Sequence, residues 1–148
     1  MSALLENKKA YFDYEILEKF EAGLELLGWE VKSLRQAQGK LAGARAIIRG
    51  GEIFLVGLDI PPYQPENMPK GFEKERTIKL LLQKKEINSL EGKLRQKRLT
   101  MVPTKLYAKN GRIKIELALV KGKKKFEKRE TIKKRETQRE IDREIKRG

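Results

Sequence analysis

Cysteine and histidine are both missing from this chain of 148 residues. Without cysteine there is no disulfide, no thiolate nucleophile and no zinc site built on cysteine. Without histidine the commonest general base is absent, as are Ser-His and Cys-His catalytic pairs. Aspartate occurs only at Asp13, Asp59 and Asp142, too scattered to indicate the carboxylate cluster of a two-metal nuclease. We therefore predict no enzyme, cofactor or metal, with a lysine- or glutamate-based enzyme as the residual alternative.

Long apolar runs and phosphate-binding glycine motifs are missing as well. No apolar run approaches the roughly 20 residues that a membrane helix needs. Residues 1–9 have no hydrophobic stretch after their charges, which argues against a signal peptide. The Gly50-Gly51 pair lacks the Lys-Ser/Thr that follows the glycine of a P-loop. We expect a cytoplasmic protein with no membrane partner.

Positive charge is what the chain has in excess. Lys and Arg number 35 against 21 Asp and Glu, which leaves a formal net charge of +14. A small domain with so much like charge repels itself, so the excess typically serves a polyanionic partner. The charge alone does not choose between RNA, DNA and an anionic membrane.

The apolar pattern predicts mainly β structure with short helices. Residues 10–16 are rich in aromatic and β-branched side chains and indicate a strand, which residues 20–26 prolong. Two hairpins are expected, residues 44–48 with 53–58 around Gly50-Gly51, and 100–107 with 113–120 around Asn110-Gly111. Prolines make residues 60–76 a surface loop, and residues 78–82 feed a second helix. This strand count favours an OB-like antiparallel β-barrel.

A short helix is expected where apolar residues recur at spacings of three and four. They are Leu24, Leu27, Val31 and Leu34. The opposite face, which we expect to be exposed, carries Glu30, Lys32, Ser33 and Arg35.

The composition changes near residue 121. Residues 121–148 hold thirteen Lys and Arg against six Asp and Glu, half of the net charge of the chain. Few of them are large and apolar, so the segment cannot bury an amphipathic face by itself. We therefore predict a barrel over residues 1–120 and a basic tail over residues 121–148 that is disordered when free and becomes helical on a partner.

Several short motifs follow one another in a characteristic order. The most specific is Gly28-Trp-Glu-Val-Lys-Ser-Leu-Arg35, and further matches lie at residues 13–16, 20–23, 79–82, 105–107, 109–112, 116–119 and 121–124. Together they resemble the SmpB family, the SsrA-binding proteins. Residues 73–78 depart from the acidic-proline-arginine stretch that is typical of this family.

The resemblance implies an OB-like barrel that grips the tRNA-like domain of transfer-messenger RNA and delivers this RNA to stalled ribosomes for trans-translation. It also implies that the basic tail enters the empty messenger channel at the small-subunit decoding site and folds there as a helix. The protein is then an RNA-binding monomer without catalysis.

The candidate RNA-binding residues are Lys8, Lys9, Glu30, Lys32, Ser33 and Arg35. Lysine and arginine pair with phosphate, whereas the carboxylate of Glu30 would accept from a base amino group or a 2′-OH, or fix the geometry of an arginine. The tail residues expected on the ribosome are Lys123, Lys124, Phe126, Lys128, Arg129, Lys133 and Arg135.

Two rival functions remain open from sequence. The first is a ribosomal or other OB-like protein that binds single-stranded RNA, which shares the charge and the fold. The second is a membrane-surface protein, which the tail disfavours because it lacks the Trp, Phe and Leu face that an interfacial helix buries.

Overall fold

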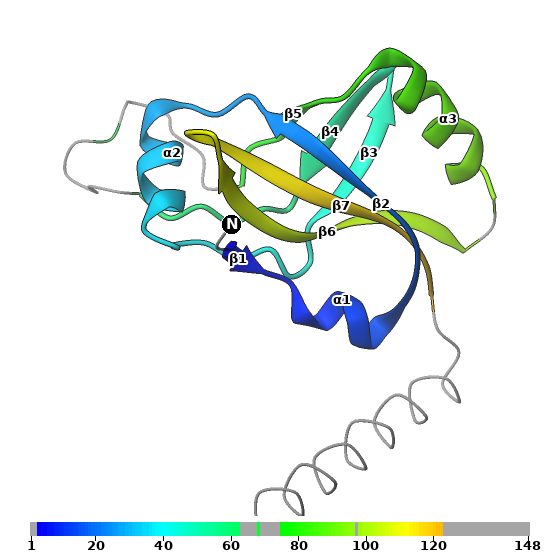
Figure 1. Cartoon of the computed structure of the whole chain (residues 1–148), viewed down its shortest axis with the longest axis horizontal. Helices are drawn as coiled ribbons and strands as arrows, with labels where there is room; N and C mark the ends of the chain where they lie inside the picture. The colour runs from blue at the N-terminus through cyan, green and yellow to red at the C-terminus, as the bar shows by residue number, and fades with distance from the viewer. Residues whose placement is uncertain (1–2, 63–67, 69–74, 97, 123–148) are drawn as a thin grey trace, which may run out of the picture.

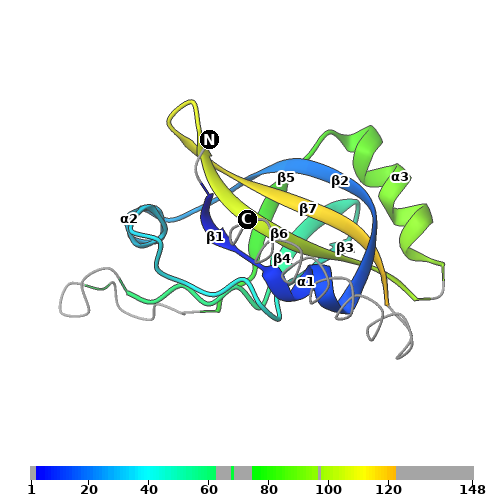
Figure 2. The ribbon, with the colours of Figure 1, turned by 60° about the horizontal axis from the view of Figure 1, so that its bottom comes forward.

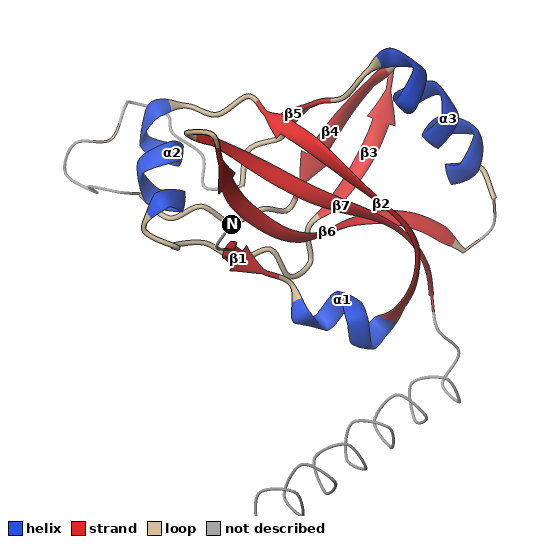
Figure 3. Ribbon diagram, viewed as in Figure 1, coloured by secondary structure: helices blue, strands red, loops and turns tan. Residues whose placement is uncertain are grey.

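The computed structural model describes residues 3–62, 68, 75–96 and 98–122 (Figure 1). In chain order the elements are β1 (Ala3–Glu6), α1 (Lys8–Asp13), β2 (Tyr14–Leu24), α2 (Gly28–Arg35), β3 (Arg45–Arg49), β4 (Glu52–Val56), β5 (Ile78–Leu81), α3 (Lys84–Leu94), β6 (Leu99–Lys109) and β7 (Arg112–Gly122). Figure 3 shows strands at the centre and short helices around them, which confirms the predicted class. No helix in the described ranges is long and apolar enough to cross a membrane.

All strand pairs are antiparallel and form one sheet in the order β1-β6-β3-β4-β5-β2-β7. β7, the last strand in this order, also pairs with β6, the second. The strands β6, β3, β4, β5, β2 and β7 therefore close into a ring. β1 pairs with residues 105–107 of β6, beyond the point where β3 pairs with β6 at Met101. Closure leaves few unpaired strand edges, which is how small antiparallel barrels avoid edge-to-edge association.

Both predicted hairpins are present. Gly50 and Gly51 join β3 to β4 with φ of 59° and 76°, and Asn110 and Gly111 join β6 to β7 with φ of 52° and 75°. Two consecutive positive φ angles match the twist of the flanking strands, and glycine and asparagine adopt them at low cost. The sequence prediction at both turns is confirmed.

Two apolar clusters lie on the two sides of the sheet. The larger one fills the inside of the ring and includes Leu34 of α2, Leu90 of α3 and Ile115 of β7, each fully buried. The smaller one lies on the other side, where Ala10 of α1 packs with Val120 of β7 and two further small residues. β7 therefore has apolar residues on both faces near its end, while Figures 1 and 2 place α2 and α3 at opposite ends of the sheet.

The predicted strand over residues 10–16 is wrong in its first half. Residues 8–13 form α1, and β2 begins at Tyr14. Ala10 of α1 is buried in the smaller apolar cluster, and this tertiary contact outweighs the strand preference of Tyr11 and Phe12. The sequence reading also missed β1, whose four residues show no polar–apolar alternation. Leu24 belongs to β2, so the helix predicted from the spacing of Leu24, Leu27, Val31 and Leu34 begins later than expected.

Candidate nucleic-acid interface

The carboxylate of Glu30 lies completely buried at the start of α2. Its Oε1 accepts from the backbone N–H of Leu27 at 2.7 Å and from Nη2 of Arg76 at 2.7 Å, and its Oε2 accepts from Nε of Arg76 at 2.9 Å. The first bond satisfies an N–H that the helix start leaves without an intrahelical partner. The other two form a bidentate pair between a carboxylate and a guanidinium, the strongest geometry such a pair can take.

Arg76 connects three segments through this pair. Besides Glu30, its Nη2 donates to the carbonyl of Glu25 at 2.9 Å, and its Nη1 donates to the carbonyl of Thr77 at 3.2 Å. A quarter of its side chain stays exposed. Arg76 thus ties the end of the loop before β5 to the β2–α2 connection and still presents one edge to the surface. The sequence reading missed this residue, although a buried carboxylate implies a cationic partner somewhere in the fold.

The prediction that Glu30 and Ser33 lie on an exposed face is wrong. Both residues are fully buried, and the hydroxyl of Ser33 donates to the carbonyl of Pro61 at 2.7 Å. Leu27, counted as inward-facing from sequence, is 49% exposed. Pro61 and Arg76 cover this side of α2, and helical periodicity cannot reveal contacts that come from such distant residues. Of the roles considered for Glu30, the contacts support fixing the geometry of an arginine.

Lys32 and Arg35 are exposed on α2, as predicted. Nη2 of Arg35 donates to the carbonyl of Gly111 at 2.9 Å, which joins α2 to the β6–β7 turn. Figure 1 shows this turn beside α2. Two further cations, Arg112 and Lys114, follow the turn on β7. Arg112 ends the motif at residues 109–112, and Lys114 is itself a residue that matches the family, so the resemblance contained a signal for both that the sequence reading did not use.

Lys8 and Lys9 are also exposed, but they lie on α1. Figures 1 and 2 place α1 and α2 apart, with β1 between them. The structure therefore brings Glu30, Ser33 and the α2 cations together and leaves the two α1 lysines at a separate place. The seven predicted tail residues lie outside the described residues.

Carboxylates on the outer side of β2 and β7 are engaged by neighbouring donors. The hydroxyl of Tyr107 donates to Glu21, and Nζ of Lys109 lies 3.2 Å from the same carboxylate. The Tyr107 hydrogen bond and then Lys109 hold the pKa of Glu21 below its ordinary value. Burial, followed by the bond to Glu21, raises the pKa of Tyr107. Glu21 is therefore ionised at neutral pH, and its charge is largely offset by local partners.

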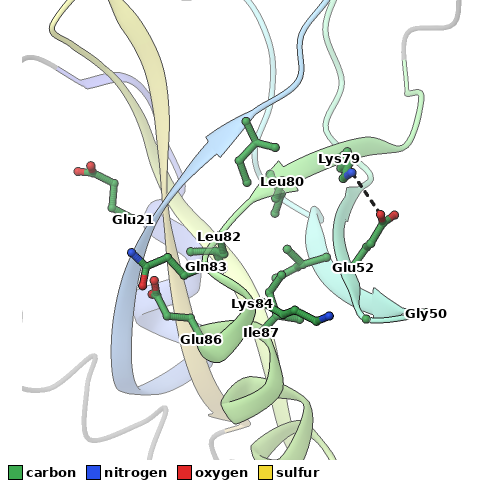
Figure 4. A pocket seen from close by; sticks show the side chains of 13 residues that line it. Glu21, Gly50, Glu52, Lys79, Leu80, Leu82, Gln83, Lys84, Glu86 and Ile87 are labelled. Carbon is green, nitrogen blue, oxygen red and sulfur yellow. Dashed lines mark hydrogen bonds and ion pairs between the residues drawn. The ribbon is translucent and has the colours of Figure 1, made fainter.

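A large cavity lies at the opposite end of the molecule from α2. It measures about 840 Å³ and opens between the β3–β4 turn, β5 and the start of α3 (Figure 4). Three carboxylates line it (Glu21, Glu52 and Glu86) together with two lysines (Lys79 and Lys84). Nζ of Lys79 already pairs with Oε1 of Glu52 at 3.2 Å. Its rim thus has no excess of positive charge, so this cavity is poorly suited to a polyanion despite its size.

Comparisons with a family model, with related sequences and with a solved structure all lead to the same family. A family model described as "SmpB protein" matches residues 4–147. The SsrA-binding protein of Syntrophobacter fumaroxidans is 51% identical over 144 residues, 97% of this chain and 89% of that protein. The SsrA-binding protein of Thermosipho africanus is 48% identical over 149 residues, 100% of this chain and 99% of that protein. A solved chain from work named "tmRNA-SmpB: a journey to the center of the bacterial ribosome" is 45% identical, with a TM-score of 0.68 and coverage of 82% of this chain and 85% of that one. With its family model matched from residue 4 to residue 147, the chain belongs to the SmpB family, as its motifs predicted.

Proposed function

We propose that this protein binds the tRNA-like domain of transfer-messenger RNA and delivers that RNA to stalled bacterial ribosomes for trans-translation. The observation that carries the proposal is identity of 51% over 97% of the chain to a protein named for binding SsrA RNA. Its net charge of +14 and its exposed cations on α1, α2 and β7 suit an RNA partner. The protein acts by binding rather than by catalysis, and it works in the cytoplasm, where its partners are.

The exposed cations make the phosphate contacts in this proposal. Lys8, Lys9, Lys32 and Arg35 are accessible, and an A-form stem is recognised mainly through phosphate, 2′-OH and shape. Glu30 and Ser33 contribute indirectly. Glu30 holds Arg76, and Ser33 holds the carbonyl of Pro61, so that the loop between β4 and β5 begins and ends at fixed positions beside α2.

The division of the chain into barrel and tail is part of the proposal. β7 pairs with β2 as far as Gly122, two residues beyond the boundary expected from sequence. The segment after it carries twelve Lys and Arg against six Asp and Glu, which suits the messenger channel of the small subunit. Among its predicted contacts Phe126 is the one aromatic, suited to stack on an rRNA base while Lys128 and Arg129 anchor phosphates.

A reconstituted translation system with a stop-less message tests both halves. The full chain should support peptide tagging. A chain truncated after Gly122 should fold, bind the tRNA-like domain and fail to tag, and Phe126→Ala should impair tagging more than RNA binding. Full tagging by the truncated chain would end the two-part model, and full tagging by Phe126→Ala would end the stacking role alone.

A pull-down from bacterial lysate with RNA sequencing separates this proposal from the general RNA binder. One dominant RNA with a tRNA-like acceptor end supports the proposal. A spread of single-stranded RNAs would favour the rival.

A further inference from the structure

Arg98 has an uncommon backbone conformation at the point where the chain enters β6. Its φ is 73°, in the left-handed region that residues other than glycine, asparagine and aspartate rarely adopt. The side chain is exposed, so burial does not explain the conformation. A residue stays in this region only where its surroundings hold it there, and such residues are often found at places with a function.

Two contacts join Arg98 to Gly122, the last residue of β7. Nη2 of Arg98 donates to the carbonyl of Gly122, and the carbonyl of Arg98 accepts from the backbone N–H of Gly122 at 3.4 Å. The second contact extends the β6–β7 ladder by one residue beyond its last pair, Leu99 with Lys121. Both backbone polar groups of Gly122 are therefore bonded to the same residue.

β2 holds Gly122 from the other edge of β7. Tyr14, the first residue of β2, pairs with Gly122, so Gly122 lies between Tyr14 and Arg98. Gly122 is not among the glycines with positive φ. Apart from its chain neighbours, none of the described residues places an atom within 4 Å of the point where its Cβ would stand. Neither the backbone nor the surroundings require glycine here, which indicates a held residue rather than a hinge.

The acceptor of the guanidinium distinguishes this contact from ordinary helix capping. A cation near the end of a helix commonly interacts with the last carbonyls of that helix. α3 ends at Leu94, and Nη2 of Arg98 donates to a carbonyl 24 residues away on β7 instead. The carbonyl of Gly122 belongs to the planar peptide group that continues the chain into the basic tail. A bond to this oxygen therefore orients the first peptide group after the barrel.

We propose that Arg98 is a positioning residue that fixes the direction in which the tail leaves the barrel. The left-handed backbone at residue 98 brings both its carbonyl and its side chain to Gly122, and the charge-assisted bond holds the outgoing peptide plane. This role in the free protein does not depend on the proposed function. Its benefit to ribosome rescue rests on that function, because a tail with a set direction loses less conformational entropy when it enters the messenger channel.

Spin labels in the full-length protein measure the direction, since the chain has no cysteine of its own. Labels at Lys85→Cys on α3 and Lys124→Cys at the start of the tail should give a wider distance distribution in Arg98→Asn than in the unaltered background. Asparagine tolerates positive φ, so this change removes the guanidinium with little backbone strain. Arg95→Asn removes the same charge from a residue that pairs with Glu91 and should leave the distribution unchanged. Equal distributions in all three proteins would overturn the proposal.

Hydrogen exchange separates positioning from general stabilisation. The amide of Gly122 should exchange about five to ten times faster in Arg98→Asn, the factor for one lost hydrogen bond of ordinary net strength. The urea midpoint of Arg98→Gly should be unchanged or higher, because glycine adopts the positive φ without strain. A lower midpoint together with unaltered exchange at Gly122 would overturn the proposal, since Arg98 would then serve only the fold.

Peptide tagging in the reconstituted system tests the benefit to rescue. Arg98→Asn should tag less than Arg95→Asn, while the two variants bind the tRNA-like domain equally well. Full tagging by Arg98→Asn would overturn the benefit to rescue. If the unaltered protein itself failed to tag, the proposed function would be rejected, and the spin-label distances would still decide the role of Arg98.

Discussion

The two ends of the barrel handle their acidic side chains in opposite ways. At the α2 end the carboxylate of Glu30 is buried and closed off by Arg76, whereas Lys32, Arg35 and Arg112 are exposed. At the α3 end Glu52 and Glu86 line an open cavity beside lysines. The cavity at the α3 end measures about 840 Å³, about three times the 280 Å³ of the cavity where α2, the end of β2 and the β6–β7 turn meet. Cavity size and binding chemistry are therefore separate properties. The sign of the accessible charge at each end depends on which carboxylates the fold buries.

The ion pairs at the two ends also differ in how deeply their side chains are buried. Glu30 is 0% exposed and Arg76 25%, whereas the pair of Lys93 with Glu18 near α3 is 35% and 46% exposed. Removing one partner of a buried pair strands the other charge away from water, while an exposed pair exchanges its partner for water at little cost.

The largest effect is expected from Glu30→Ala. It should lower the free energy of unfolding by about 3 kcal/mol, near the bottom of the range for a broken buried pair because Arg76 can partly reach water. Urea unfolding measures this, with Glu18→Ala as the matched control at no more than about 0.5 kcal/mol. RNA affinity of the folded variant should fall too, because Arg76 loses its anchor. Equal stability of the two variants would remove the distinction between the ends.

Salt dependence of RNA binding gives the next largest effect. Affinity for the tRNA-like domain should fall steeply as salt rises, because phosphate contacts release counterions. Lys32→Ala at the α2 end should reduce the log–log slope by about 1, and Lys85→Ala on α3 should leave it unchanged. A slope near zero for the unaltered protein would contradict the phosphate contacts altogether. A slope that falls equally in both variants would contradict only their placement.

The Lys79–Glu52 pair beside the larger cavity should matter little. Its side chains are 38% and 51% exposed, so a double-mutant cycle with Lys79→Ala and Glu52→Ala should give a coupling below about 1 kcal/mol. Affinity for the tRNA-like domain should be unaltered in Glu52→Ala. A clear gain in affinity there would mean that RNA does approach the α3 end.

The smallest effect concerns Glu21 on β2. Tyr107→Phe removes the hydrogen bond that contributes most to its lowered pKa, so that pKa should rise toward its ordinary value. A group whose folded pKa is lowered stabilises the fold above its unfolded pKa and loses that effect as pH falls through the folded pKa. The variant should therefore show a weaker loss of stability with acid. A carboxyl titration by NMR follows Glu21 directly, and an unmoved midpoint would show that Lys109 alone sets its pKa.

Sequence reasoning succeeded for features that are local in the chain and failed for features that depend on contacts between distant residues. Gly50-Gly51 and Asn110-Gly111 were sufficient to place both hairpins, because a turn with two positive φ angles is a local property. Ala10 and Tyr11 were misassigned, because their helix depends on packing against strands near the other end of the chain. Glu30 and Ser33 were placed on the wrong side of α2, because their partners Arg76 and Pro61 lie 46 and 28 residues further along.

By itself, the sequence determined the charge of the protein, its lack of histidine and cysteine, its turns and its family. These features depend on composition, on local backbone preference or on motif order, none of which requires a folded chain. Only the tertiary structure decided which charges reach solvent. It buried Glu30 against Arg76 and gathered Arg35, Arg112 and Lys114 around one small pocket. Accessible charge depends on which distant segments come into contact, and no local pattern in the sequence records that.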